Sequence, residues 1–138
     1  MAAEARHLET SVPILADIDI VTARQQGRAL AERVGFIGSD LTVIATVISE
    51  LGRNMLTYAE KGVIRLRPHY FGGRRGIMVV AEDEGPGIVD VELALQDAYS
   101  TSKSLGLGLP GTRRLMDEFD IVSVLGKGTK VTVTKWVS

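Results

Sequence analysis

The second quarter of the chain carries the clearest pattern of hydrophobic positions, and its period is that of a helix. Apolar residues recur there at steps of three and four, at Leu41, Ile44, Ile48, Leu51 and Met55. This spacing lines them up along one side of a helix, as a stripe that packs against a core. Because Ser39 is a typical N-cap residue, we predict a helix from Ser39 to about Tyr58.

A weaker helical pattern precedes this segment and predicts a first helix from Asp17 to Val34. Either Asp17 or Asp19 is expected to cap its start, and Gly35 is suited to end it. The stretch from Thr10 to Leu15 fits a strand at a sheet edge, because it contains a proline that is unable to donate to a central ladder.

Two strands follow and are expected to form a hairpin. Residues 63–70 alternate between apolar and polar positions, which is typical of a strand with one exposed face. Its arginines, with Arg74 and Arg75, are predicted to form the solvated side of the hairpin; the alternative is a basic patch for nucleic acid. A glycine pair then turns the chain into Ile77–Ala81, an apolar run without alternation that predicts a strand buried on both faces.

The last third of the chain alternates between helix and strand. We expect a short helix within Asp90–Tyr99, a helix from Leu109 to about Phe119, and strands at Ile121–Leu125 and Val131–Trp136. The order of elements predicts an α+β fold. Residues 1–138 are expected to form a single domain, a two-layer sandwich with helices on one face of a mixed, largely antiparallel sheet.

The composition narrows the range of functions. The 138 residues are 45% hydrophobic and 24% charged, with a net charge of −1, which argues against nucleic acid or a membrane as the main partner. Cysteine is absent, so disulfides, thiol catalysis and cysteine-based metal sites are excluded. Because no apolar run is long enough to span a bilayer and the first ten residues lack a signal-peptide pattern, we expect a cytoplasmic protein.

Two glycine-rich turns are the expected place for the chemistry. The first, Asp83–Gly87, follows a buried strand and therefore places the Asp83 carboxylate at the rim of a pocket on a constrained backbone. The second, Leu105–Gly111, leads into a helix, and its bare N–H groups and the positive helix end favour an anion. We interpret the pair as a nucleotide pocket, with the base at Asp83 and the phosphates at the second turn. Each turn alone is also compatible with an ordinary loop.

Glu50 and Asn54 lie one turn apart on the second predicted helix, off its apolar stripe. Side chains four residues apart share one face of a helix, so the carboxylate and the amide point the same way. An amide oxygen suits Mg²⁺, and the carboxylate is able to take a proton from an attacking hydroxyl or to orient it. A solvated polar face is the alternative for these two residues alone, and Arg53 is expected to be a surface cation.

Taken in this order, the motifs resemble the sequence boxes of the GHKL superfamily of ATP-binding domains, which have the Bergerat fold. Glu50–Asn54 looks like the N box, Asp83–Gly87 like the G1 box and Leu105–Gly111 like the G2 box. The segment Gly126–Thr129 is similar to the glycine turn that closes the adenine pocket. On all four motifs together, the chain is identified as a member of this superfamily.

The resemblance implies ATP and Mg²⁺ as cofactors and a role for each matching residue. It implies that Glu50 is the catalytic base, Asn54 the Mg²⁺ ligand and Asp83 the acceptor for the adenine amino group. Thr129 is expected to line the base pocket, and either Lys103 or Arg113 to help neutralise the γ-phosphate. The remaining nucleotide-binding residues that the resemblance implies are Gly85, Gly87, Gly106, Leu107, Gly108 and Gly111.

Within the superfamily, residues 18–25, 93–101 and 108–119 look most like the small bacterial protein-serine kinases of partner-switching systems, specifically the stressosome switch kinases. That family phosphorylates serine or threonine on STAS-domain proteins of the stressosome, and its freed form binds and activates a PP2C-type phosphatase. These are therefore the expected substrate and partner. The anti-sigma kinases, which share the boxes and bind a sigma factor, are one alternative. A nucleotide-gated module that activates a phosphatase without transfer is another, and the catalytic fragment of a histidine kinase is a weaker third.

Overall fold

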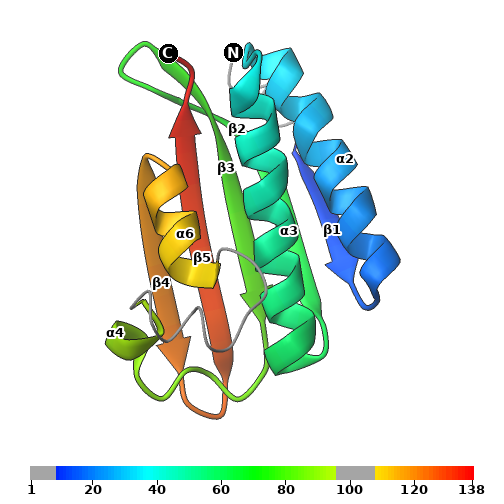
Figure 1. The fold of residues 1–138 in the computed structure, drawn as a ribbon, viewed down its shortest axis with the longest axis vertical. Helices are drawn as coiled ribbons and strands as arrows, with labels where there is room; N and C mark the ends of the chain where they lie inside the picture. Colours follow the sequence, from blue (N-terminus) through cyan, green and yellow to red (C-terminus); the bar gives the residue numbers. More distant parts are fainter. Residues whose placement is uncertain (1–8, 96–107) are drawn as a thin grey trace.

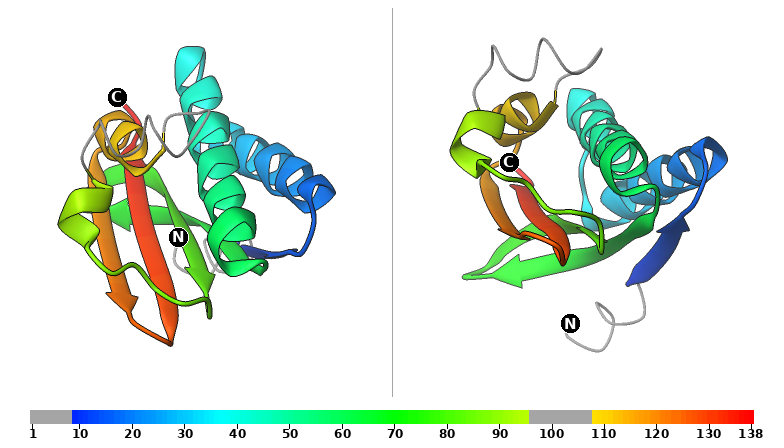
Figure 2. Two further views of the ribbon diagram at one scale, coloured as in Figure 1. Left: turned by 60° about the horizontal axis from the view of Figure 1, so that its bottom comes forward. Right: turned by 90° about the horizontal axis from the view of Figure 1, so that it is seen from below.

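The computed structural model describes residues 9–95 and 108–138, which form an open sheet with helices on one face (Figure 1). The sheet has five strands in the order β1-β2-β3-β5-β4. Their bounds are β1 Thr10–Ile14, β2 Gly62–Phe71, β3 Arg74–Asp83, β4 Glu118–Val124 and β5 Gly128–Trp136. The helices are α2 Asp17–Val34, α3 Ser39–Ala59, α4 Val91–Ala94 and α6 Gly108–Leu115. Figure 2 shows them on the same side of the sheet, so the predicted α+β two-layer sandwich is confirmed.

Each neighbouring pair of described strands is antiparallel, so the expectation of a mixed sheet is wrong for this part of the chain. The connections explain this result. The pairs β2–β3 and β4–β5 are hairpins, and the two helices between β1 and β2 run up and back, so β2 starts in the direction opposite to β1. The edge position predicted for the strand that contains Pro13 is confirmed by β1.

The core lies between the sheet and the helices, and α3 supplies the stripe that the hydrophobic spacing predicted. Its Ile44 and Ile48 are fully buried against β2 and β3, where Leu66 and Val79 are paired in register and also fully buried. Burial of each such side chain stabilises the fold by roughly 1.5 to 3 kcal/mol. The apolar faces of α3 and of the central strands therefore determine how the helix lies on the sheet.

The central strand β3 is less symmetric than its sequence predicted. Ile77 and Val79 belong to the core under the helices, whereas Met78 and Val80 point to the opposite face, which no described helix covers. Val80 is 9% exposed and Met78 is half-buried, so the predicted burial on both faces holds only in part. On this face Arg65 pairs with Glu82 at 2.7 Å, in agreement with a solvated hairpin side.

The ends of α2 follow the predicted signals closely. The helix stops at Val34 because Gly35 takes a φ of 123°. At its start the Asp19 carboxylate accepts hydrogen bonds from the N–H groups of Leu15 at 2.9 Å and Ala16 at 3.0 Å. Of the two predicted capping residues, Asp19 is therefore the one that satisfies free N–H groups before the first turn.

Two helix boundaries differ most clearly from the prediction, and β3, β4 and β5 begin earlier than predicted, at Arg74, Glu118 and Gly128. The helix α3 begins at Ser39, but its N-cap residue is Gly38, with a φ of 63°, and no side chain caps the helix. The helix α6 ends at Leu115, well before Phe119, because the N–H of Asp117 donates to the carbonyl of Thr134 at 2.9 Å and the chain joins the sheet. Strand pairing therefore competes with the last helical turn and replaces it.

The short helix expected within Asp90–Tyr99 is present as α4, Val91–Ala94, and the residues from 96 onward in that segment lie outside the described part. Within the described residues, no helix combines the length and the apolar character needed to cross a membrane.

Candidate functional site

A cavity of about 380 Å³ opens beside the C-terminal half of α3, at the end of β3 and the start of α6. This volume is in the range of small-molecule sites. Most of its lining is apolar: Leu51, Met55, Ala59, Ala81, Pro86, Ile88, Val89, Ala94, Leu109 and Val131. The polar side chains that line it are those of Asn54, Tyr58, Asp83, Asp90 and Thr129. Five of the predicted site residues therefore meet in one cavity, at positions 54, 83, 87, 108 and 129.

Asp83 is the last residue of β3 and is held by backbone groups on both sides. Its Oδ1 accepts hydrogen bonds from the N–H of Gly85 at 2.9 Å and from the N–H of Thr129 at 3.3 Å. Among the described residues the other oxygen, Oδ2, has no hydrogen-bond partner. The carboxylate is thus oriented by one oxygen and leaves the second one free to accept a hydrogen bond from a ligand in a largely apolar cavity.

Ser123 connects this pocket to the edge of the sheet, and the sequence interpretation missed it. Its Oγ accepts a hydrogen bond from the N–H of Ile88 at 2.7 Å and lies 2.9 Å from Oγ1 of Thr129. The turn before β5 is tied to the same loop, since the N–H of Gly126 donates to the carbonyl of Pro86 at 2.9 Å. The alternation of residues along β4 is the signal that could have found it, because it places Ser123 on the same face of the strand as Ile121.

Two glycines let this loop and the β4–β5 turn pack together. Gly87 has a φ of 80°, and a Cβ there would lie 2.6 Å from the carbonyl oxygen of Val124. Gly128 has a φ of 131°, and a Cβ there would overlap the carbonyl group of Asp83. Both positions combine a left-handed backbone with no room for a side chain, so they shape the wall of the cavity through protein contacts.

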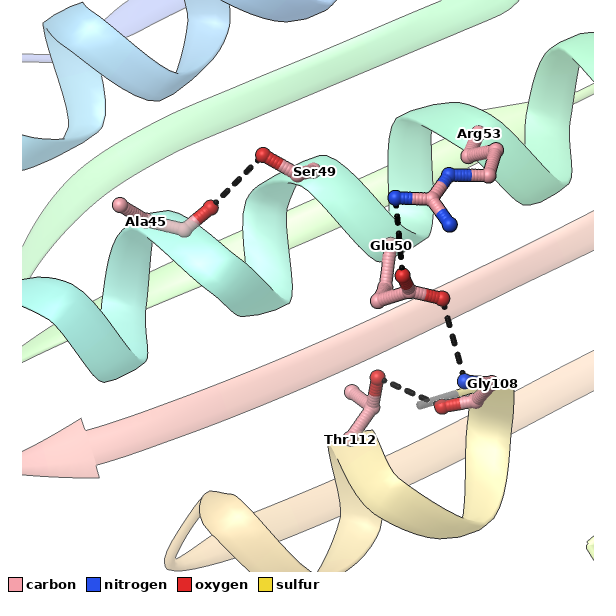
Figure 3. Close-up of polar contacts among 6 residues, drawn as sticks. All are labelled: Ala45, Ser49, Glu50, Arg53, Gly108 and Thr112. Atoms are coloured by element: carbon pink, nitrogen blue, oxygen red, sulfur yellow. Dashed lines mark hydrogen bonds and ion pairs between the residues drawn. The ribbon is translucent and has the colours of Figure 1, made fainter. Parts of the chain in front are cut away.

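Glu50 lies on α3 with its carboxylate buried between two donors (Figure 3). Its Oε1 pairs with the guanidinium of Arg53 at 3.1 Å, and its Oε2 accepts a hydrogen bond from the N–H of Gly108 at 3.1 Å. Gly108 is the first residue of α6, and its carbonyl accepts a hydrogen bond from the hydroxyl of Thr112 at 3.0 Å. The carboxylate therefore sits at the positive end of α6, where a helix favours negative charge.

Asn54 lies one turn beyond Glu50 on α3 and lines the cavity, half-buried. The amide oxygen is a hard ligand of the kind that Mg²⁺ accepts when phosphate oxygens and water complete its shell. A single neutral protein ligand next to a cavity fits this mode of binding. Asn54 lines the cavity whereas Glu50 does not, and the alternative of a solvated polar face does not hold for Glu50, which is 3% exposed.

The other predicted residues fall into three groups. Gly108 lines the cavity, whereas Gly111 lies inside α6 and is buried away from the lining. Gly85 does not line the cavity either; a Cβ there would lie 2.5 Å from the Cβ of Ala59, so its contact in this structure is with the end of α3. Lys103, Gly106 and Leu107 lie outside the described residues, and their roles stay predictions.

Replacing Ser123 by alanine is expected to lower the free energy of unfolding by about 1 to 3 kcal/mol. The reason is that the half-buried N–H of Ile88 and the hydroxyl of Thr129 lose their partner. Urea denaturation measures this change. Ser11→Ala is the matched control, because Ser11 is exposed on the edge strand β1 and should change stability by less than about 0.5 kcal/mol. Equal effects of the two substitutions would contradict the role given to Ser123.

Comparison with known proteins places this site in a family. Residues 14–135 match the family model described as histidine kinase-like ATPase domain. Among curated relatives, the chain is 46% identical to the serine/threonine-protein kinase RsbT of Bacillus subtilis (strain 168), over 94% of this chain and 97% of the relative. It is 32% identical to the anti-sigma F factor of Caldanaerobacter subterraneus subsp. tengcongensis and 31% identical to that of Thermoanaerobacter sp. (strain X514), each over 83% of both chains. The chain therefore belongs to the histidine kinase-like ATPase domain family, as its motif resemblance to the GHKL superfamily predicted.

Proposed function

We propose that this chain is an ATP-dependent protein serine/threonine kinase of a bacterial partner-switching system, acting in the cytoplasm on a STAS-domain protein. The observation that carries the proposal is the arrangement around one cavity. Asp83, Asn54 and Gly108 all line it, and the N–H of Gly108 binds the carboxylate of Glu50. The 46% identity to a relative named a serine/threonine-protein kinase supports the same activity.

The part of the cavity around Asp83, where the nucleotide base is proposed to bind, accounts for the choice of nucleotide. Adenine offers an exocyclic amino group, and Oδ2 of Asp83 is placed to accept a hydrogen bond from it. The apolar lining at Ala81, Ile88 and Val131 suits the flat ring, and Thr129 closes the pocket beside the carboxylate. A nucleotide base with a carbonyl in place of that amino group would place one hydrogen-bond acceptor against another, the Asp83 carboxylate, which is unfavourable.

Glu50, Asn54 and the start of α6 account for the reaction. The hydroxyl oxygen of the protein substrate forms a bond to the γ-phosphorus while the bond from this phosphorus to the bridging oxygen breaks and its electron pair leaves with ADP. Glu50 takes the proton from the hydroxyl on Oε2, which exchanges its hydrogen bond with Gly108 for the substrate. Asn54 would hold Mg²⁺, which would neutralise charge on the phosphates. The N–H groups at the start of α6, with Lys103 or Arg113, add to this neutralisation.

The partners follow from the resemblance to the switch kinases. The substrate is a STAS-domain stressosome protein, and the kinase released from it binds and activates a PP2C-type phosphatase. An anti-sigma factor that binds a sigma factor is the second candidate function, favoured by the identities of 31% and 32% to anti-sigma F factors. Affinity capture of partners with and without ATP separates these two functions.

The kinase activity is tested with radiolabelled ATP, Mg²⁺ and purified STAS-domain proteins from the same organism. We expect acid-stable label on a serine or threonine of one of them, and a loss of at least about tenfold in the rate with Asn54→Ala, which removes the proposed metal ligand. Thr22→Ala is a control substitution of a polar residue on α2, away from the cavity. Acid-labile label would indicate histidine, and ATP-dependent capture of a sigma factor without label would favour the anti-sigma function.

A further inference from the structure

The ion pair between Glu50 and Arg53 joins a buried carboxylate to a half-exposed cation. The side chain of Glu50 is 4% exposed, whereas that of Arg53 is 48% exposed. The two residues are three positions apart on α3, so the contact lies within one helix. The sequence suggested only a surface cation at Arg53, yet its guanidinium is bound to the residue that the proposed reaction uses as base.

The two oxygens of Glu50 are held by different parts of the fold. Oε1 is held by Arg53 of the same helix, and Oε2 by the first N–H of α6 (Figure 3). The contact with Arg53 lies within α3 and moves with Glu50, whereas the bond to Gly108 depends on the position of α6 relative to α3. If the bond to Gly108 is exchanged for a substrate hydroxyl, the contact with Arg53 still limits rotation of the carboxylate.

We propose that Arg53 is a positioning residue: it holds Oε1 of Glu50 so that Oε2 faces the substrate hydroxyl during transfer. This inference rests on the proposed function, because it takes Glu50 as the base. Arg53 does not line the cavity, so its effect is expected to pass through Glu50 and not through contact with ATP. Transfer depends steeply on the orientation of reacting groups, so loss of this contact should lower kcat.

An exposed ion pair within another helix provides the comparison. On α2, Arg28 and Glu32 are paired at 3.9 Å with side chains 49% and 59% exposed. Exposed pairs of this kind contribute little to stability. Arg28→Met and Arg53→Met therefore each remove one guanidinium charge and keep an unbranched apolar side chain, but only the second removes a partner from a buried carboxylate.

The first experiment compares Arg53→Met, Arg53→Lys and Arg28→Met in steady-state transfer to the STAS-domain protein labelled by the wild type. We expect Arg53→Met to lower kcat by roughly ten- to a hundred-fold with the KM for ATP within about twofold. Arg53→Lys should retain kcat within about threefold, since a single contact to Oε1 asks for a cation and not for a fork of donors. Arg28→Met should match the wild type. An unchanged kcat in Arg53→Met, or a change confined to the KM for the protein substrate, overturns the proposal.

The second experiment is a double-mutant cycle with Glu50→Gln, measured in single turnovers with excess enzyme. If Arg53 acts through the Glu50 carboxylate, Arg53→Met should change the transfer rate by less than about twofold in the Glu50→Gln background. If Arg53→Met lowers the transfer rate by the same factor in the wild type and in Glu50→Gln, the inference is overturned, and Glu50 is left as the base. A Glu50→Gln variant with the wild-type rate instead refutes the base assignment, so the two failures are distinguishable.

Discussion

Glu50→Gln is expected to lower kcat for phosphoryl transfer by about a hundred- to ten-thousand-fold, the range for loss of a general base. Glutamine keeps the size of the side chain, and its amide oxygen is able to accept the hydrogen bond from the N–H of Gly108. Its amide nitrogen then faces Arg53, which is half-exposed and within reach of water. The substitution therefore removes the proton acceptor with little change to the fold. Initial rates with labelled ATP measure the effect.

ATP binding separates a chemical role of Glu50 from a structural one. The dissociation constant of Glu50→Gln for ATP should stay within about twofold of the wild type, because the carboxylate does not line the cavity. Glu32→Gln, at an exposed position of α2, is the control for loss of one negative charge. A parallel loss of ATP binding would mean that the bond between Glu50 and α6 shapes the pocket instead of serving the reaction.

The second large effect is expected from Asp83→Asn, which should weaken ATP binding by roughly ten- to a hundred-fold or more. The amide oxygen of asparagine is able to keep the bonds from the N–H groups of Gly85 and Thr129, so the loop should stay folded. The amide nitrogen then replaces Oδ2 and presents a donor to the donor amino group of adenine. Such a mispaired contact costs about 1 to 3 kcal/mol, and more when a charge is lost.

Discrimination between nucleotides gives a second measure of the same contact. The wild type should reject GTP, whose base has a carbonyl where adenine has the amino group, and Asp83→Asn should lose much of this discrimination. Titration of both proteins with ATP and GTP, after a check of folding by circular dichroism, measures it. Glu84→Gln is the neighbouring control, since Glu84 is exposed. Unchanged ATP affinity in Asp83→Asn would refute the placement of the base.

The α3 stripe and the end of α2 show what sequence alone is able to predict. Apolar residues at helical spacing form one face of α3, and this face is buried against the core. Gly35 ends α2 through its own backbone conformation. The glycine motifs likewise indicated where a cavity lies, since Gly87 and Gly108 line it, although Gly85 and Gly111 do not and residues 105–107 lie outside the described part. These signals are local, so no knowledge of the neighbouring elements was needed.

The end of α6 and the N-cap of α3 show where local signals fail. The helical pattern after Gly108 continues to Phe119 in the sequence, but pairing with β5 takes the chain into the sheet from Asp117. The serine at the start of α3 has a side chain suited to capping, yet Gly38 before it takes the N-cap position. At the end of α6, a hydrogen bond to the distant Thr134 outweighs a helix propensity of a few tenths of a kcal/mol to about 1 kcal/mol.

The sequence by itself determined the α+β class, the helix that carries both Glu50 and Asn54, and the presence of a carboxylate at the end of the central strand. Only the tertiary structure decided the all-antiparallel pairing of the described strands, the contact of Ser123 with the pocket loop, and the bond that Gly108 makes to Glu50. The physical reason is distance along the chain. Gly108 lies 58 residues from Glu50, and Ser123 lies 35 residues from Ile88, so these hydrogen bonds exist only once the sheet has brought α3, α6 and β4 together.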